Sequence, residues 1–142
     1  MNGGGVVYIH DNKVEVYQDI LNGRNIECLI INKEKSFFEI AEECEKKLKN
    51  QAIELFDMIL LHAESKKVLE SWYALEQLQI GEYTQTIGVM DIPPHILLDI
   101  IKNCYLKPIF YYGRENAHNP KIKNICKQYE IVFINNQILQ ID

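Results

Sequence analysis

Short apolar segments alternate along most of this chain with stretches whose apolar residues repeat at helical spacing. Five apolar runs are predicted to be strands: Cys28–Ile31, Phe56–Leu61, Thr86–Val89, Pro108–Tyr112 and Ile131–Ile134. Polar or turn residues bound each run, as is typical of strands buried on both faces. The runs start 22 to 30 residues apart, which leaves room for one strand, one helix and two short loops each.

Amphipathic helices are predicted between these strands. The first begins at a capping box made by Ser36 and Glu39. The second follows the apolar spacing from Val68 to Leu78, and the third opens at Pro93–Pro94. The fourth is capped by Asn119, with proline next to it in the first helical turn. Each helix has one apolar face, so each is expected to pack against the sheet.

Four consecutive βα units followed by a fifth strand predict a parallel sheet with helical crossovers. This pattern fits either an open doubly wound sheet or a segment of a (β/α) barrel. The beginning of the chain differs, because Val6–His10 and Lys13–Tyr17 flank the polar pair Asp11–Asn12 and resemble a β-hairpin. We therefore predict one domain over residues 1–142, with a hairpin extension at 1–25 and βα units at 26–142.

Composition narrows the class of protein. The 142 residues are 47% hydrophobic, which is enough to form a packed core, and the formal charge of -5 disfavours nucleic acid or an anionic membrane as partner. The apolar runs are far shorter than a membrane span, and the beginning of the chain shows no secretory signal, so a cytoplasmic location is expected. Four widely spaced cysteines favour reduced, buried thiols over a zinc site.

Several strand-end motifs, in order, resemble the aldo-keto reductase superfamily, whose fold is a (β/α)8 barrel. Phe56–His62 is similar to the family's apolar strand that ends in its catalytic histidine, and Thr86–Val89 to its Ile-Gly-Val strand. Leu106–Pro108 and Asn119–Val132 match the elements that follow. The resemblance covers roughly Cys28 to Asn135 and implies a partial barrel of the aldo-keto reductase type.

Reductases of this family transfer a hydride from NADPH to a carbonyl group, using a tyrosine, a lysine, an aspartate and a histidine. Lys33 falls at the family's lysine position and His62 at its histidine position. The family's aspartate and tyrosine lie in upstream elements that have no match in this sequence. Asp11 and Tyr17 are the possible replacements, but both belong to the predicted hairpin. Both residues also suit a purely structural role, Lys33 as a solvated charge and His62 as a side chain hydrogen-bonded to a loop.

The residues that hold the cofactor in this family are replaced. Met90–Asp91 stands where the family has Ser-Asn, Tyr112 stands in place of its glutamine, and Asn135 in place of its stacking aromatic residue. The resemblance therefore implies no bound cofactor, with Lys33 and His62 as vestiges of the catalytic site. The alternative is a minimal NADPH-dependent carbonyl reductase that uses these two residues with another proton donor.

Within the superfamily, the segment Lys127–Ile131 is similar to the regulatory subunit of glutamate–cysteine ligase, which does no redox chemistry. This resemblance implies a non-catalytic subunit that binds the ligase catalytic subunit and modulates glutathione synthesis. Five parallel strands also leave unpaired edges, which a protein partner or a second copy would cover. Tyr111 and Tyr112 are candidates for the partner surface, with the core as the alternative. An orphan βα domain that forms homo-oligomers remains a third hypothesis.

Overall fold

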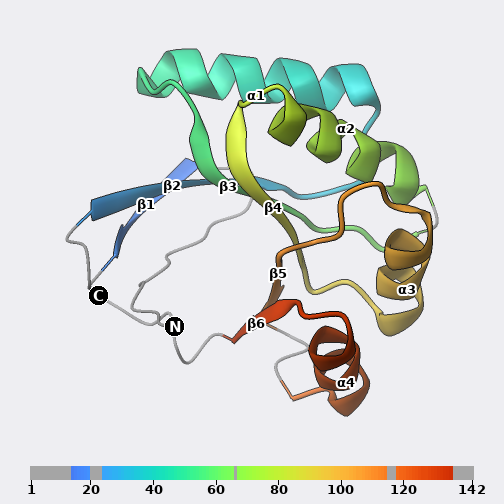
Figure 1. Ribbon diagram of the computed structural model, residues 1–142. Helices are drawn as coiled ribbons and strands as arrows, with labels where there is room; N and C mark the ends of the chain where they lie inside the picture. Colours follow the sequence, from blue (N-terminus) through green and yellow to red (C-terminus); the bar gives the residue numbers. More distant parts are fainter. Residues whose placement is uncertain (1–13, 20–23, 66, 115–117, 136–142) are drawn as a thin grey trace.

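A computed structural model describes residues 14–19, 24–65, 67–114 and 118–135, in which a six-stranded sheet carries helices between its parallel strands (Figure 1). The strand order along the sheet is the sequence order, β1 to β6, with β1 antiparallel to β2 and all later pairs parallel. In chain order the elements are β1 Val14–Asp19, β2 Arg24–Ile31, α1 Phe37–Gln51, β3 Phe56–Leu61, α2 Val68–Ile80, β4 Thr84–Met90, α3 Pro94–Asn103, β5 Phe110–Gly113, α4 Pro120–Gln128 and β6 Val132–Asn135.

The helices begin where the local chemistry predicts. Ser36 caps α1 in a complete capping box with Glu39, and the Asn119 side chain accepts hydrogen bonds from two backbone N–H groups of α4. Pro94 and Pro120 occupy first-turn positions, where the missing N–H costs no helical hydrogen bond. The predicted βα units are therefore confirmed as elements, and only their ends shift by a few residues.

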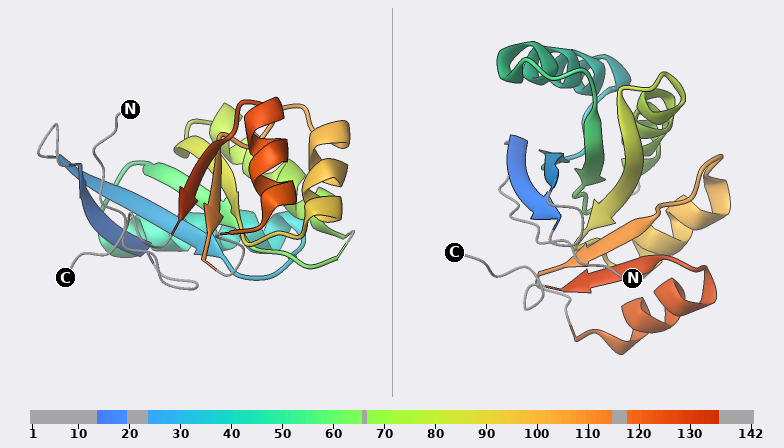
Figure 2. Two further views of the ribbon diagram at one scale, coloured as in Figure 1. Left: turned by 90° about the horizontal axis from the view of Figure 1, so that it is seen from below. Right: turned by 60° about the vertical axis from the view of Figure 1, so that its left-hand side comes forward.

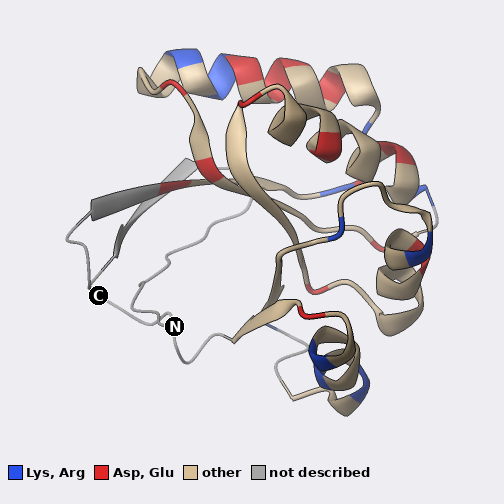
Figure 3. Cartoon of the chain, in the orientation of Figure 1, with Lys and Arg blue, Asp and Glu red and all other residues tan. Residues whose placement is uncertain are grey.

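All of the helices in the described part of the chain pack on one face of the sheet. The larger core joins them to alternate strand residues such as Leu29, Ile59 and Ile87, and Trp72 of α2 is buried there. Figure 3 colours many positions of α1 as charged, and none of these residues is buried. This one-sided arrangement is that of a barrel wall, because a doubly wound sheet has helices on both faces.

The opposite face of the sheet is concave and apolar. It holds a second cluster of buried residues that come from strands alone: Cys28, Ile30, Met58, Leu60, Met90 and Tyr112. Figure 2 shows the strands curving around this face with the helices outside. Over the described residues the sheet does not close, since β1 and β6 are its two edges. The fold is thus a partial barrel of the expected kind.

The predicted hairpin is described only in part. Its second arm corresponds to β1, but β1 pairs with β2, from Val14 opposite Leu29 to Asp19 opposite Arg24. Its expected first arm, Val6–His10, lies outside the described residues. Strand β2 starts at Arg24, ahead of the apolar run at Cys28, and so gives β1 a partner. Strand β1 thereby covers one edge of the parallel strands.

Within the described ranges, no helix has both the length and the apolar character needed to cross a membrane.

Candidate functional site

A pocket of about 280 Å³ lies where the carboxyl ends of β2, β3 and β5 converge. Its lining residues follow those strands: Asn32, Lys33, Glu34, His62, Ala63, Glu64 and Arg114. In parallel βα folds the loops after the strands form the usual ligand site, because the strand ends meet at one edge. The two residues predicted from the sequence, Lys33 and His62, are therefore brought together in one pocket.

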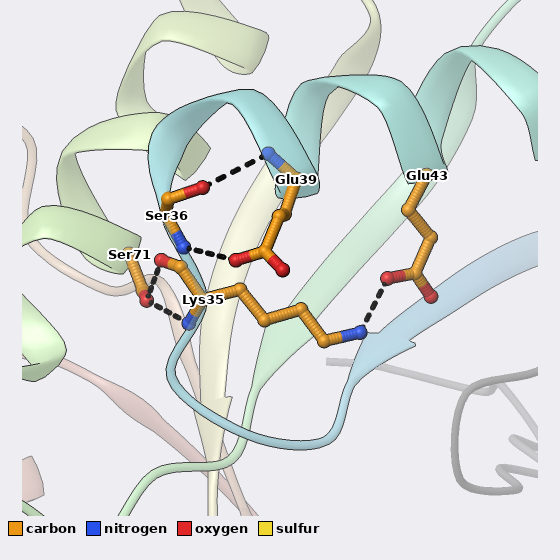
Figure 4. Close-up of polar contacts among 5 residues, drawn as sticks. All are labelled: Lys35, Ser36, Glu39, Glu43 and Ser71. Atoms are coloured by element: carbon orange, nitrogen blue, oxygen red, sulfur yellow. Dashed lines mark hydrogen bonds and ion pairs between the residues drawn. The ribbon is translucent and has the colours of Figure 1, made fainter.

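The loop that follows β2 is held firmly against α1 and α2 (Figure 4). The Ser71 hydroxyl accepts a hydrogen bond from the Lys35 backbone N–H at 2.8 Å and donates one to the Lys35 carbonyl at 2.7 Å. The Lys35 ammonium pairs with Glu43 at 2.7 Å, and Ser36 and Glu39 exchange the capping bonds at 3.2 and 2.9 Å. These contacts fix the backbone immediately after the pocket residues.

Glu34 joins the loops after β2 and β3. Its carboxylate accepts a hydrogen bond from the Ser65 hydroxyl and another from the Glu64 backbone N–H at 3.3 Å. Burial acts to raise the pKa of Glu34, but these hydrogen bonds and those of neighbouring backbone groups outweigh it, so the pKa falls below its usual value. The carboxylate is therefore charged at neutral pH, and it is directed to the loop after β3.

His62 is oriented by the backbone of the neighbouring strand. Its ring Nδ1 lies 2.9 Å from the Met90 carbonyl oxygen. A carbonyl oxygen can only accept, so Nδ1 carries the proton, and Nε2 is the ring nitrogen available to a ligand. The backbone N–H of His62 also donates to the Ile31 carbonyl at 2.8 Å. The hydrogen-bonded role foreseen for this histidine is present, but its partner is the backbone of β4 and not a loop.

An ion pair between the buried Asp91 and the partly exposed Arg114 lies at the pocket, which Arg114 lines. The Asp91 carboxylate accepts the Arg114 backbone N–H at 2.7 Å and lies 3.4 Å from Arg114 Nε. The Asp91 side chain is only 1% exposed, whereas that of Arg114 is 29% exposed. Asp91 has a left-handed backbone, with φ of 50°, and its N–H donates to the Tyr112 carbonyl at 3.0 Å. Asp91 therefore positions the residue that follows β5.

Tyr111 and Tyr112, the residues suggested for a partner surface, are both buried. Tyr111 is fully buried, its hydroxyl donates to the Ile92 carbonyl at 2.7 Å, and its ring stacks on Phe133. Tyr112 is 4% exposed on the concave face, where burial raises the pKa of its hydroxyl despite the nearby Arg114 guanidinium. The structure buries both rings, because successive β5 residues alternate between the helix-covered face and the concave face of the sheet.

Arg114 is the site residue that sequence reasoning missed. It follows the aromatic strand end directly, as Lys33 and His62 follow theirs, and this shared position was the available signal. Asp91 was noticed only as a poor match for a cofactor contact. Its pairing with Arg114 joins residues 23 positions apart, and sequence spacing does not reveal such a contact.

Comparisons with known proteins point to one group of enzymes. No protein-family profile matches the chain. A curated relative, the 9,11-endoperoxide prostaglandin H2 reductase of Trypanosoma cruzi, is 29% identical over 86 residues, covering 57% of this chain and 30% of that protein. This distant match supports the resemblance to the aldo-keto reductase superfamily.

Solved structures of low sequence identity have the same fold as the described part of this chain. A Bombyx mori aldo-keto reductase in complex with NADP is 16% identical with a TM-score of 0.66, covering 77% of this chain and 40% of that one. An aldo-keto reductase from a Medee basin deep-sea metagenome is 20% identical with a TM-score of 0.67, covering 75% and 41%. The described sheet and helices therefore have the fold of part of the barrel seen in these reductases.

These findings correct the functional prediction. The similar proteins are reductases, so the expected role as a regulatory subunit of glutamate–cysteine ligase is wrong. That prediction relied on the short stretch Lys127–Ile131, at and after the end of α4, and on lost cofactor residues, neither of which distinguishes branches of a fold family. The chain spans about 30% of the curated relative and about 40% of the solved reductases.

Proposed function

We propose that this chain carries the carbonyl-binding part of an oxidoreductase site of the aldo-keto reductase type. The observation that carries the proposal is the meeting of Lys33 and His62 in one pocket at the carboxyl ends of adjacent parallel strands. Both residues match the family's catalytic positions, and the similarity to reductases supports the same reading.

Lys33 and His62 can act together on a carbonyl oxygen. Reduction of a carbonyl adds a hydride to its carbon and a proton to its oxygen, so negative charge develops on the oxygen. The Lys33 ammonium can stabilise that charge, because it lines the pocket and none of the described residues forms a hydrogen bond or ion pair with its Nζ. When both ring nitrogens carry a proton, the His62 imidazole can donate the one on Nε2 to that oxygen, because Nδ1 is held by the Met90 carbonyl.

The residues at the family's cofactor position do not fit the nicotinamide amide. The Met90 carbonyl is hydrogen-bonded to His62, and the Met90 side chain is fully buried. The Asp91 carboxylate accepts a hydrogen bond from the Arg114 backbone N–H. Tyr112 is buried as well. None of the three presents an amide group to a ligand. The proposal therefore assigns the described residues to the substrate carbonyl and none of them to the cofactor.

The test is turnover of methyl phenylglyoxylate, a neutral keto ester, with NADPH or NADH. The rate is measured as the loss of cofactor absorbance. We expect Lys33→Met and His62→Gln each to lower kcat/KM by roughly 100-fold or more, as loss of a positioned acid or charge does. Lys102→Met, at the exposed end of α3, is the matched control and should retain full activity. The urea midpoint of each variant verifies that its fold is retained.

Two outcomes would contradict the proposal. One is the absence of turnover by the unmodified chain with either cofactor. The other is an equal rate in Lys33→Met, His62→Gln and the control, which would assign the pocket no part in the reaction.

A further inference from the structure

The pairing of β2 with β3 places His62 but does not extend to Lys33. The paired residues end at Ile31 opposite Leu61, and one further hydrogen bond joins the His62 N–H to the Ile31 carbonyl at 2.8 Å. His62 is therefore held by the sheet. Lys33 lies two residues beyond the end of β2, in the loop before α1 and past the last pair of the described ladder. Contacts between loops must therefore set the place of Lys33 relative to His62.

Glu34, the residue after Lys33, joins this loop to the loop after β3. One carboxylate oxygen, Oε1, accepts the Glu64 backbone N–H at 3.3 Å, and the other, Oε2, accepts the Ser65 hydroxyl. These partners lie two and three residues after His62. Resting on the proposed function, we infer that Glu34 is a positioning residue, whose two hydrogen bonds hold Lys33 close enough to His62 for both to reach one carbonyl oxygen.

Both segments that Glu34 joins are anchored to α2. The Ser65 hydroxyl, besides donating to Glu34, accepts the Lys67 backbone N–H at 3.3 Å at the start of this helix. On the other side, the backbone N–H and carbonyl of Lys35 are both hydrogen-bonded to the Ser71 hydroxyl (Figure 4). A contact between two anchored segments holds its neighbours in place more firmly than a contact to a free loop does.

The position of Lys33 matters most in the transition state. Negative charge develops on the carbonyl oxygen only there, so a charge already held in place favours the transition state over the bound substrate. The exposed Lys33 side chain has many rotamers, and movement of its backbone as well would bring the ammonium to the oxygen for only a small part of the time. Loss of the Glu34 contacts should therefore lower kcat and leave KM nearly unchanged.

Turnover of methyl phenylglyoxylate measures this effect. We expect Glu34→Ala to lower kcat by roughly tenfold, with a change in KM of less than about twofold. Glu34→Gln should retain most of the rate, because its amide can accept the Glu64 N–H and donate to the Ser65 hydroxyl. Glu54→Ala, at an exposed position before β3, is the matched control and should retain full activity.

Variants of Ser65 break the same link from the other loop. Ser65→Ala should lower kcat in the same way as Glu34→Ala, whereas Ser65→Thr keeps the hydroxyl and should retain most of the rate. The double variant Glu34→Ala/Ser65→Ala should be no slower than Glu34→Ala alone, because both changes remove one contact. Urea midpoints verify the fold of each variant. If Glu34→Ala does not fold, the comparison of Ser65→Ala with Ser65→Thr decides.

A spectroscopic measurement tests the position of Lys33 without turnover. The NMR chemical shift of the proton on Cε1 of the His62 ring responds to a charge close to the ring. At a fixed alkaline pH, we expect Lys33→Met to shift this signal. In the Glu34→Ala background the same change should shift it by no more than about half as much, because the field of a charge falls with distance. The Glu34→Gln background should retain most of the shift.

The outcomes distinguish this inference from the proposed function. The inference is overturned if Lys33→Met leaves the His62 signal unchanged, or shifts it equally with and without Glu34. Equal kcat in Glu34→Ala and Glu54→Ala would also overturn it, while the proposed function stands if Lys33→Met and His62→Gln remain slow. A response of His62 to Lys33 that depends on Glu34, in a chain with no reductase turnover, would support the positioning link and overturn the proposed function.

Discussion

Gly88 shows how closely the strands approach at the scale of one residue. A Cβ atom at this position would lie 2.6 Å from the Phe110 carbonyl oxygen and 2.9 Å from a Leu60 methyl carbon. The first of these neighbours is backbone, which cannot move without breaking the β4–β5 pairing. The glycine of the Ile-Gly-Val motif is therefore required by packing in this fold.

Gly88→Ala should consequently destabilise the chain by about 1–3 kcal/mol, the usual cost of overpacking a core. Gly81→Ala is the matched control, because a Cβ there would meet mainly the exposed Tyr83 ring, at 3.2 Å, which can rotate away. The free energy of unfolding from urea titrations measures both changes. Equal effects of the two substitutions would contradict the argument.

The two predicted site residues follow from local sequence, whereas the residue that completes the pocket does not. Lys33 and His62 each come directly after an apolar strand, and that position alone directs a side chain to the ligand-binding end of a parallel sheet. Arg114 has the same position, but its role depends on Asp91, which adopts a left-handed backbone at the end of β4. Neither that conformation nor that pairing has a sequence signature here.

Among the elements, α2 anchors the connection between α3 and β5. The buried carboxylate of Glu76 accepts the backbone N–H groups of Tyr105 and Leu106 at 2.6 and 2.7 Å. The Trp72 indole N–H donates to the Leu106 carbonyl at 2.9 Å. One helix thereby satisfies three backbone groups of a loop that is far from it in sequence, and this loop leads into β5, the strand that Arg114 follows.

Glu76→Gln should lower the free energy of unfolding by about 1–2 kcal/mol, because two hydrogen bonds lose their charged acceptor in a buried setting. Glu54→Gln, an exposed position before β3, is the control and should be near neutral. Chemical denaturation gives both values. A Glu76→Gln variant as stable as the unmodified chain would show that the carboxylate charge contributes nothing.

The boundaries of the elements were predictable where a cap fixes them. The capping box at Ser36 and the asparagine cap at Asn119 define the starts of α1 and α4 in both the sequence and the structure. The start of β2 was not predictable from apolar residues, because Arg24–Glu27 is mostly polar and is ordered into a strand by pairing with β1. Pairing partners, unlike caps, lie outside the local sequence.

For the molecule as a whole, the placement of every described helix on one face leaves the thiols beneath the helices protected. Burial raises the pKa of Cys44 in α1 to about 12, with help from adjacent acidic residues, and the pKa of Cys126 in α4 to about 11. Both thiols therefore stay protonated at mildly alkaline pH, where an unburied cysteine forms appreciable thiolate.

We expect iodoacetamide to modify Cys44 and Cys126 of the native chain only as fast as the chain unfolds. Cys104, which is half-buried, should react first, although burial and the nearby Glu76 carboxylate raise its pKa too. Mass spectrometry of native and urea-unfolded samples measures the order of labelling. Rapid modification of Cys44 in the native chain would contradict the described packing of α1 on the sheet.

The sequence by itself determined the alternation of strands and helices, the caps and the strand-end positions of Lys33 and His62. These features depend on periodicity and local hydrogen bonding, which act over a few residues. Only the tertiary structure decided that all the helices share one face, that Tyr111 and Tyr112 are buried, and that Asp91 holds Arg114 beside His62. Those outcomes depend on the curvature of the sheet, which brings together strand ends far apart in the chain.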